Sequence, residues 1–135
     1  MKYLFILPFI ICTYAPFAQK PLPQSPVLSR GKIVYQQVCL SCHQADGSGV
    51  SSLNPPLIKS SWVTGDKKKL INIVLKGLAE KVRINGSYFS NTMPAQNMLT
   101  DQQIADVLTF VRNSFGNKAG VIAVKEVAQQ RKMIK

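Results

Sequence analysis

The stretch that decides the interpretation of this chain is Cys39-Leu40-Ser41-Cys42-His43. It places one thiol on each side of a dipeptide and an imidazole directly after the second thiol. Such a group is used in three kinds of site: a redox-active disulfide pair, a zinc site and the covalent attachment of a haem. A chance match is the fourth reading, so the rest of the sequence has to decide.

The supply of cysteine and histidine favours haem attachment. A structural zinc ion needs four ligands, but His43 is the only histidine, and Cys12 is the only cysteine outside the motif. A thioredoxin-like pair needs a strand–helix setting in an α/β sheet, and no such alternation is visible. In a haem-attachment motif Cys39 and Cys42 hold the haem and His43 lies under the iron. The predicted cofactor is therefore one covalently attached haem c.

A single histidine also limits the sixth ligand of the iron. Bis-histidine ligation within the chain is excluded, which leaves Met93, Met98, Met133, a lysine or an open site. Pro94 restricts Met93 to extended backbone, which suits a loop that holds a sulfur atom in a fixed place. We predict Met93 as the ligand and Met98 and Met133 as core-filling side chains. A His/Met pair fills both axial positions and raises the reduction potential relative to two histidines.

The N-terminal part of the chain has the features of an export signal. Lys2 precedes an apolar stretch over residues 3–12, which is shorter than the about 20 residues of a membrane span. We expect residues 1–18 to be a signal peptide, with an uncleaved anchor as the alternative. The prolines of residues 19–28 predict an extended linker. Residues 29–135 then form one domain, in the periplasm or otherwise exported, soluble or N-terminally anchored.

The expected fold class is all-α, with about three main helices and a short basic helix in the C-terminal tail. The main helices are expected from about Ser29 to Val38, after an Asp66 N-cap, and between a Thr100–Gln103 capping box and Gly116. Residues 44–65 show no helical or strand period, and residues 81–92 read as a turn-rich connection. A loop as long as 44–65 is acceptable where it wraps a large flat ligand.

The charge balance bears on partners. The chain has 17 Lys+Arg and 6 Asp+Glu, a formal net charge of +11. This surplus is either a solvated surface or a surface that steers the protein toward an acidic partner or an anionic membrane. No nucleic-acid motif is visible, so nucleic acid is not an expected partner.

Taken in order, the motif and three further stretches resemble a class I bacterial cytochrome c domain. The further stretches are Gly47 and Gly49 with Asn54-Pro55-Pro56-Leu57, then Asn91-Thr92-Met93-Pro94, and Leu99 to Gly116. The resemblance covers about residues 28–130. It implies an all-α cytochrome c fold whose first and third helices cross near Gly31, with loops wrapped around one haem. It also implies a monohaem electron carrier, with a periplasmic dehydrogenase as donor and an oxidase or reductase as acceptor.

The resemblance assigns further residues. A carbonyl of the Pro55-Pro56 stretch, expected to be that of Pro56, accepts from the second ring nitrogen of His43. Trp62 lies against the haem edge or a propionate, or else is an ordinary core tryptophan. Gln44 departs from the family, because many relatives have glycine directly after the histidine. This departure puts only the local path of the loop in question.

Two other functions share the same residues. The chain could be a dedicated electron-transfer subunit of a periplasmic dehydrogenase or reductase complex. With Met93 away from the iron, it could instead be a haem enzyme or a gas sensor. The carrier is preferred, and a carrier is not itself an enzyme.

Overall fold

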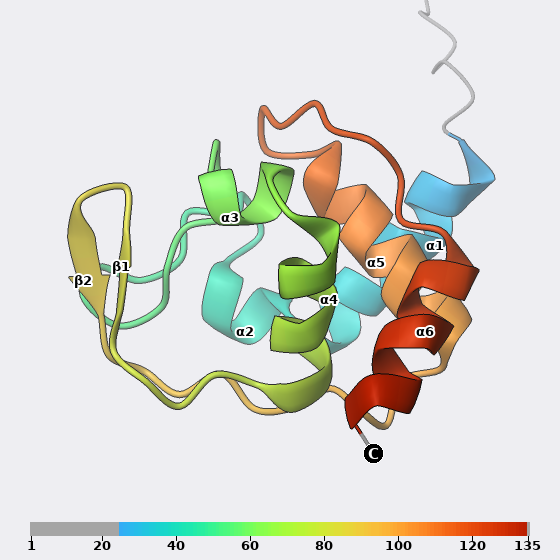
Figure 1. Cartoon of the computed structure of the whole chain (residues 1–135). Coiled ribbons are helices and arrows are strands. Elements are labelled where there is room, and N and C mark those ends of the chain that lie inside the picture. The colour runs from blue at the N-terminus through green and yellow to red at the C-terminus, as the bar shows by residue number, and fades with distance from the viewer. Residues whose placement is uncertain (1–24, 135) are drawn as a thin grey trace, which may run out of the picture.

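Residues 25–134 are described by the computed structural model of this chain. The expected signal peptide and residues 19–24 of the linker lie outside this part. The elements are, in chain order, α1 (Pro26–Val38), α2 (Leu40–His43), α3 (Ser61–Thr64), α4 (Lys67–Lys76), β1 (Val82–Ile84), β2 (Ser87–Phe89), α5 (Asp101–Arg112) and α6 (Val124–Ile134). Figure 1 shows the β1–β2 hairpin at one end of the molecule and α6 at the other. The fold is all-α, as expected, apart from this small antiparallel hairpin.

The crossing of α1 and α5 forms the centre of the fold. A Cβ atom added at Gly31 would collide with the backbone oxygen of Asp106 and lie 2.6 Å from Cβ of Phe110, so only glycine permits this close approach. Beside the crossing, Nε of Arg30 lies 2.6 Å from a carboxylate oxygen of Asp106. The expected crossing of the first and third main helices near Gly31 is thus confirmed.

The second and third main helices begin where they were expected. The Asp66 side chain accepts from the backbone N–H of Lys69 and caps α4. Thr100 and Gln103 form the reciprocal capping box that starts α5. The basic tail forms α6, which packs on α4 and α5 and buries Val127 completely. Its burial explains why this short polar helix is stable, since isolated helices of this length are marginal in water.

Three expectations about local structure need correction. The loop expected over residues 44–65 contains the short helix α3. The first helix begins at Pro26 rather than near Ser29, so the last residues of the expected linker are helical. Proline is well tolerated in the first turn of a helix, where its missing N–H has no intrahelical partner. Residues 81–92 are not only turns, because β1 and β2 pair across Asn85-Gly86. That dipeptide favours a two-residue hairpin turn, but strands of three residues leave almost no period to read.

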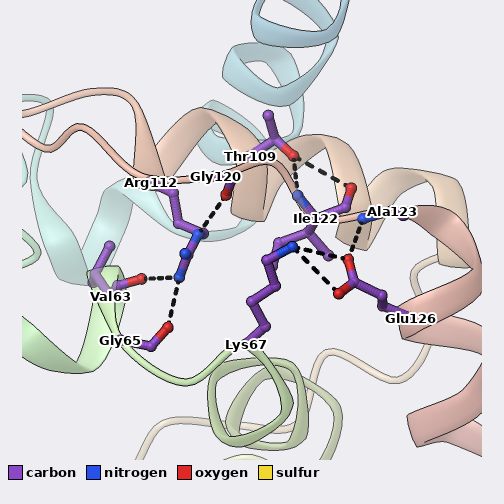
Figure 2. A network of polar contacts seen from close by, with 9 residues as sticks. All are labelled: Val63, Gly65, Lys67, Thr109, Arg112, Gly120, Ile122, Ala123 and Glu126. Atoms are coloured by element: carbon purple, nitrogen blue, oxygen red, sulfur yellow. Dashed lines mark hydrogen bonds and ion pairs between the residues drawn. The ribbon is translucent and has the colours of Figure 1, made fainter.

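A buried arginine fastens the loops around α5, as Figure 2 shows. Nε of Arg112 donates to the carbonyl of Gly120 at 2.8 Å, and Nη1 donates to the carbonyls of Val63 at 2.6 Å and Gly65 at 3.2 Å. Burial lowers the pKa of Arg112 from its usual value, and the three carbonyls compensate the desolvated charge. The segments before α4 and before α6 are therefore both tied to the end of α5.

The start of α6 is held by a second group of contacts in the same network (Figure 2). The Thr109 hydroxyl accepts from the backbone N–H of Ile122 at 3.0 Å. A carboxylate oxygen of Glu126 accepts from the N–H of Ala123 at 2.7 Å, and Nζ of Lys67 lies 3.3 Å from the same side chain. These contacts connect α6 to α4 and α5.

Gln44, which departs from the family pattern, has a strained backbone. It ends α2 with φ 64° and ψ 163°, a region that is essentially restricted to glycine. The conformation persists because the Tyr35 hydroxyl donates to the Gln44 carbonyl at 2.6 Å. Tyr35 is itself fixed by contact with the rings of Phe110 and Phe115. The turn from α2 into the loop therefore costs conformational free energy, which a glycine at this position would avoid.

We predict that Gln44→Gly stabilises the protein. Removing the side chain relieves the backbone strain, while the added freedom of the unfolded chain offsets part of the gain, so the free energy of unfolding should rise by about 1 kcal/mol. Chemical denaturation of the holoprotein measures this change. Gln44→Ala is the matched control, because alanine keeps the strain. An equal gain in Gln44→Ala would contradict the strain argument.

Candidate functional site

The predicted attachment and ligand residues meet at one cavity. Cys39, Cys42 and His43 reach it from α2 and the residue before it, and Met93 reaches it from the loop between β2 and α5. The other walls are mainly apolar side chains from α3, α4, β1 and α5, among them Val63, Leu70, Val74, Ile84, Leu108 and Val111. Segments far apart in the sequence thus enclose a mostly apolar space whose lining includes two thiols, an imidazole and a thioether.

His43 is prepared to bind a metal through one nitrogen. Its Nδ1 lies 3.1 Å from the carbonyl oxygen of Pro55. A carbonyl can only accept, so Nδ1 carries the proton and Nε2 keeps a free lone pair. Burial lowers the pKa of His43 below its usual value, which favours the neutral imidazole that ligates metals.

The partner of His43 corrects the expectation for Pro56. The carbonyl that faces the imidazole belongs to Pro55. The residue before a proline is held extended, and successive carbonyls of an extended chain point to opposite sides, so only one of the two prolines can serve. The loop decides which, because the N–H of Gly49 donates to the His43 carbonyl and the N–H of Leu57 donates to the Gly47 carbonyl. Pro56 still lines the cavity.

The cysteine pair does not have the character of a redox disulfide site. Burial raises the pKa of Cys39, the first thiol of the pair, to about 11. A catalytic redox cysteine has a lowered pKa, because the thiolate is the nucleophile. Among residues 25–134, moreover, no group of three or more His, Cys, Asp and Glu side chains is placed to hold a bare metal ion.

Backbone pairing holds Met93 against the end of α4. Its N–H and its carbonyl both bond to Leu78, each at 2.8 Å. A Cβ at Gly77, whose φ is +75°, would collide with the Met93 carbonyl, so glycine is needed for this approach. Met98 and Met133 are 92% and 69% exposed, so the expectation that they fill the core was wrong. Neither lines the cavity.

Trp62 lies at the cavity wall rather than in the helix–helix core. The ammonium group of Lys69 lies 3.7 Å from the centroid of its ring, a cation–π contact. The side chain is half-buried. Its contact with the edge of a flat ligand stays a prediction.

The residues present fit a covalently bound haem. The apolar walls suit a flat macrocycle, the paired thiols stand together at one side, and a neutral imidazole and a thioether face the same space. These are the donor types that hold haem iron in cytochromes c.

The helices among residues 25–134 include none that is long and apolar enough to cross a membrane.

Comparison with known proteins agrees with this chemistry. The family model described as "Cytochrome c" matches residues 28–115. The chain is 40% identical over 109 residues to the gluconate 2-dehydrogenase cytochrome c subunit of Pantoea cypripedii, a match that covers 76% of this chain and 24% of that protein. It is 34% identical over 123 residues to the cytochrome c subunit of the quinone alcohol dehydrogenase of Gluconacetobacter polyoxogenes, covering 88% and 26%.

A shorter relative is matched over most of its length. The chain is 29% identical over 99 residues to cytochrome c-552 of Thermus thermophilus, covering 70% of this chain and 75% of that protein. By contrast, it spans about a quarter of the length of the dehydrogenase subunits that it matches.

Proposed function

Because the chain belongs to the cytochrome c family, we propose that it is a monohaem carrier that passes single electrons between exported redox proteins. Cys39 and Cys42 would hold the haem c, and His43 and Met93 would be the axial ligands. The bound haem supplies the change between ferric and ferrous iron. The observation that carries the proposal is the cavity at which these four side chains meet.

The chain's own residues have separate tasks in this proposal. The Pro55 carbonyl holds the His43 ring in one orientation and one tautomer. The apolar walls exclude water, and an apolar shell around a site tunes its reduction potential. Met93 would fill the sixth position, so that no site remains open for oxygen or a substrate. A filled coordination sphere favours a carrier over a catalyst.

A second candidate is a fixed subunit of a dehydrogenase complex. The relatives that support it are named as cytochrome c subunits of gluconate and alcohol dehydrogenases and as the cytochrome subunit of a fructose dehydrogenase. In this case the same haem site would be the electron outlet of one enzyme. The haem enzyme or gas sensor is the third candidate, and it requires Met93 to be away from the iron.

The surface charge supports an acidic partner. Of the six acidic residues, Asp101, Asp106 and Glu126 form ion pairs within the protein, so the remaining surface is strongly cationic. On the hairpin that contributes to the cavity wall, Nζ of Lys81 and the Arg83 guanidinium carbon lie 4.8 Å and 5.8 Å from the Tyr88 ring centroid. We propose that this hairpin steers an acidic redox partner to the haem.

We also propose that the protein is exported, through the signal peptide expected over residues 1–18.

We predict that Met93→Ala lowers the reduction potential and abolishes the ferric methionine–iron charge-transfer band. Thioether sulfur favours reduced iron, and its loss opens the sixth position. Visible spectroscopy and a redox titration of the holoprotein measure both effects. Met98→Ala is the control, because that side chain is 92% exposed. A wild-type protein that is high-spin and binds carbon monoxide readily would contradict the carrier and favour the enzyme or sensor.

The hairpin can be tested with charge reversal and a small anionic oxidant. Lys81→Glu with Arg83→Glu should slow oxidation by ferricyanide at low ionic strength by about ten-fold, since attraction near the site becomes repulsion. Stopped-flow absorbance follows the rate. Lys32→Glu with Lys125→Glu makes the same charge change on α1 and α6, away from the hairpin (Figure 1). If both double variants slowed the oxidation equally, the rate would depend only on the net charge of the protein and not on the hairpin.

The free carrier and the fixed subunit differ in how they purify. Isolated from its native cells under mild conditions, a free carrier should elute at the size of a small monohaem protein. A subunit should elute together with a dehydrogenase and show dye-linked dehydrogenase activity in the same fractions. Salt at high concentration is the control, because it dissociates a weak electrostatic complex but leaves a stable complex intact.

A further inference from the structure

Helix α6 lies beyond the residues that the family model matches, which end at 115, yet it is part of the core. Ile122, which precedes it, and Val127 are buried, and its Gln130 bonds to Asn72 on α4. Other side chains of α6 lie outside the core, among them Val124, Met133 and the partly exposed Arg131. Arg131 reaches instead to the loop between β2 and α5, which carries Met93.

The contacts of Arg131 occupy all three of its guanidinium nitrogens. Nη1 donates to the carbonyl of Asn97 at 2.9 Å, and Nη2 donates to the carbonyl of Leu99 at 2.7 Å. Nε donates to the Asp101 carboxylate at 2.6 Å. The planar guanidinium presents its donors in a fixed fork, so the two carbonyls and the carboxylate are held in one arrangement.

The first part of the loop is held by other bonds, from side chains as well as from the backbone. Met93 pairs with Leu78 at one end, and the N–H of Gln96 donates to the Val74 carbonyl at 2.8 Å. Met98, between the two carbonyls that Arg131 binds, is 92% exposed and anchors nothing. Arg131, which lies beyond the residues that the family model matches, thus secures the far end of this loop.

We propose that Arg131 is a positioning residue that keeps the Met93 loop closed, so that α6 increases the occupancy of Met93 on the iron. The proposal rests on Met93 as the axial ligand. With haem bound, an open loop would take the Met93 sulfur away from the iron and would leave its position free for another ligand. An external ligand therefore binds in proportion to the population of the open form.

The test compares imidazole binding to three ferric holoproteins. Arg131→Met keeps the apolar stem and loses every donor, and imidazole should then bind about ten-fold more tightly than to wild type, because the open form is more populated. Lys67→Met is the matched control. It removes another cationic link between α4 and α6, at 3.3 Å from Glu126, without touching the loop. Its imidazole affinity should stay within about two-fold of wild type.

A second variant separates the carbonyl bonds from the ion pair. Asp101→Asn removes the charge partner of Arg131 and leaves the Asn97 and Leu99 carbonyls bound, so imidazole affinity should again stay within about two-fold of wild type. If Lys67→Met or Asp101→Asn matches Arg131→Met, the loop clamp is overturned. Should Arg131→Met fail to fold, Arg131→Gln, which retains one amide donor group, replaces it with a smaller change in the same direction.

Failure of the ligand assignment looks different. If Met93→Ala keeps the charge-transfer band, Met93 is not the ligand, and the axial assignment of the proposed function fails together with the clamp. If Met93→Ala loses the band while Arg131→Met binds imidazole as wild type does, the clamp alone fails.

Discussion

The close approach of α1 to α5 at Gly31 is the constraint on which the rest of the structure depends. α1 leads directly into Cys39, and α5 supplies Leu108 and Val111 to the cavity wall. The crossing therefore fixes the distance between the attachment motif and the wall that faces it. A side chain at Gly31 would push the two helices apart. It would therefore both weaken the packing of the core and widen the site.

Around this crossing, loops are fastened by side chains that bond to backbone. Arg112 bonds to three carbonyls, Arg131 bonds to two, and the Tyr35 hydroxyl bonds to the Gln44 carbonyl. Loops that wrap a flat ligand have few partners for their own polar groups, and buried groups left unpaired are costly. Arginine meets this need well because one side chain can serve several carbonyls at fixed angles.

Much of this arrangement could be predicted from the sequence where the signal is local. The motif around His43, the N-cap at Asp66 and the capping box at Thr100 involve neighbours in the chain and can be read directly. Met93 was selected by elimination, and its place at the cavity agrees with that choice, although its ligation stays a prediction. The contacts that were missed are not local: the choice of Pro55 over Pro56 depends on how a loop folds back, and the carbonyls bound by Arg112 and Arg131 carry no side-chain signature.

The position of α6 in the chain has a consequence for the order in which the protein is assembled. The attachment motif, the cavity walls and Met93 all precede it, so a chain made from its N-terminus contains these groups before it contains α6. The Met93 loop therefore receives its last fastening only when the final described helix has emerged and docked on α4 and α5. If Arg131 closes the loop as proposed, the site would have all its chemical groups before this fastening is made, and a bulky prosthetic group could enter before the loop closes over it.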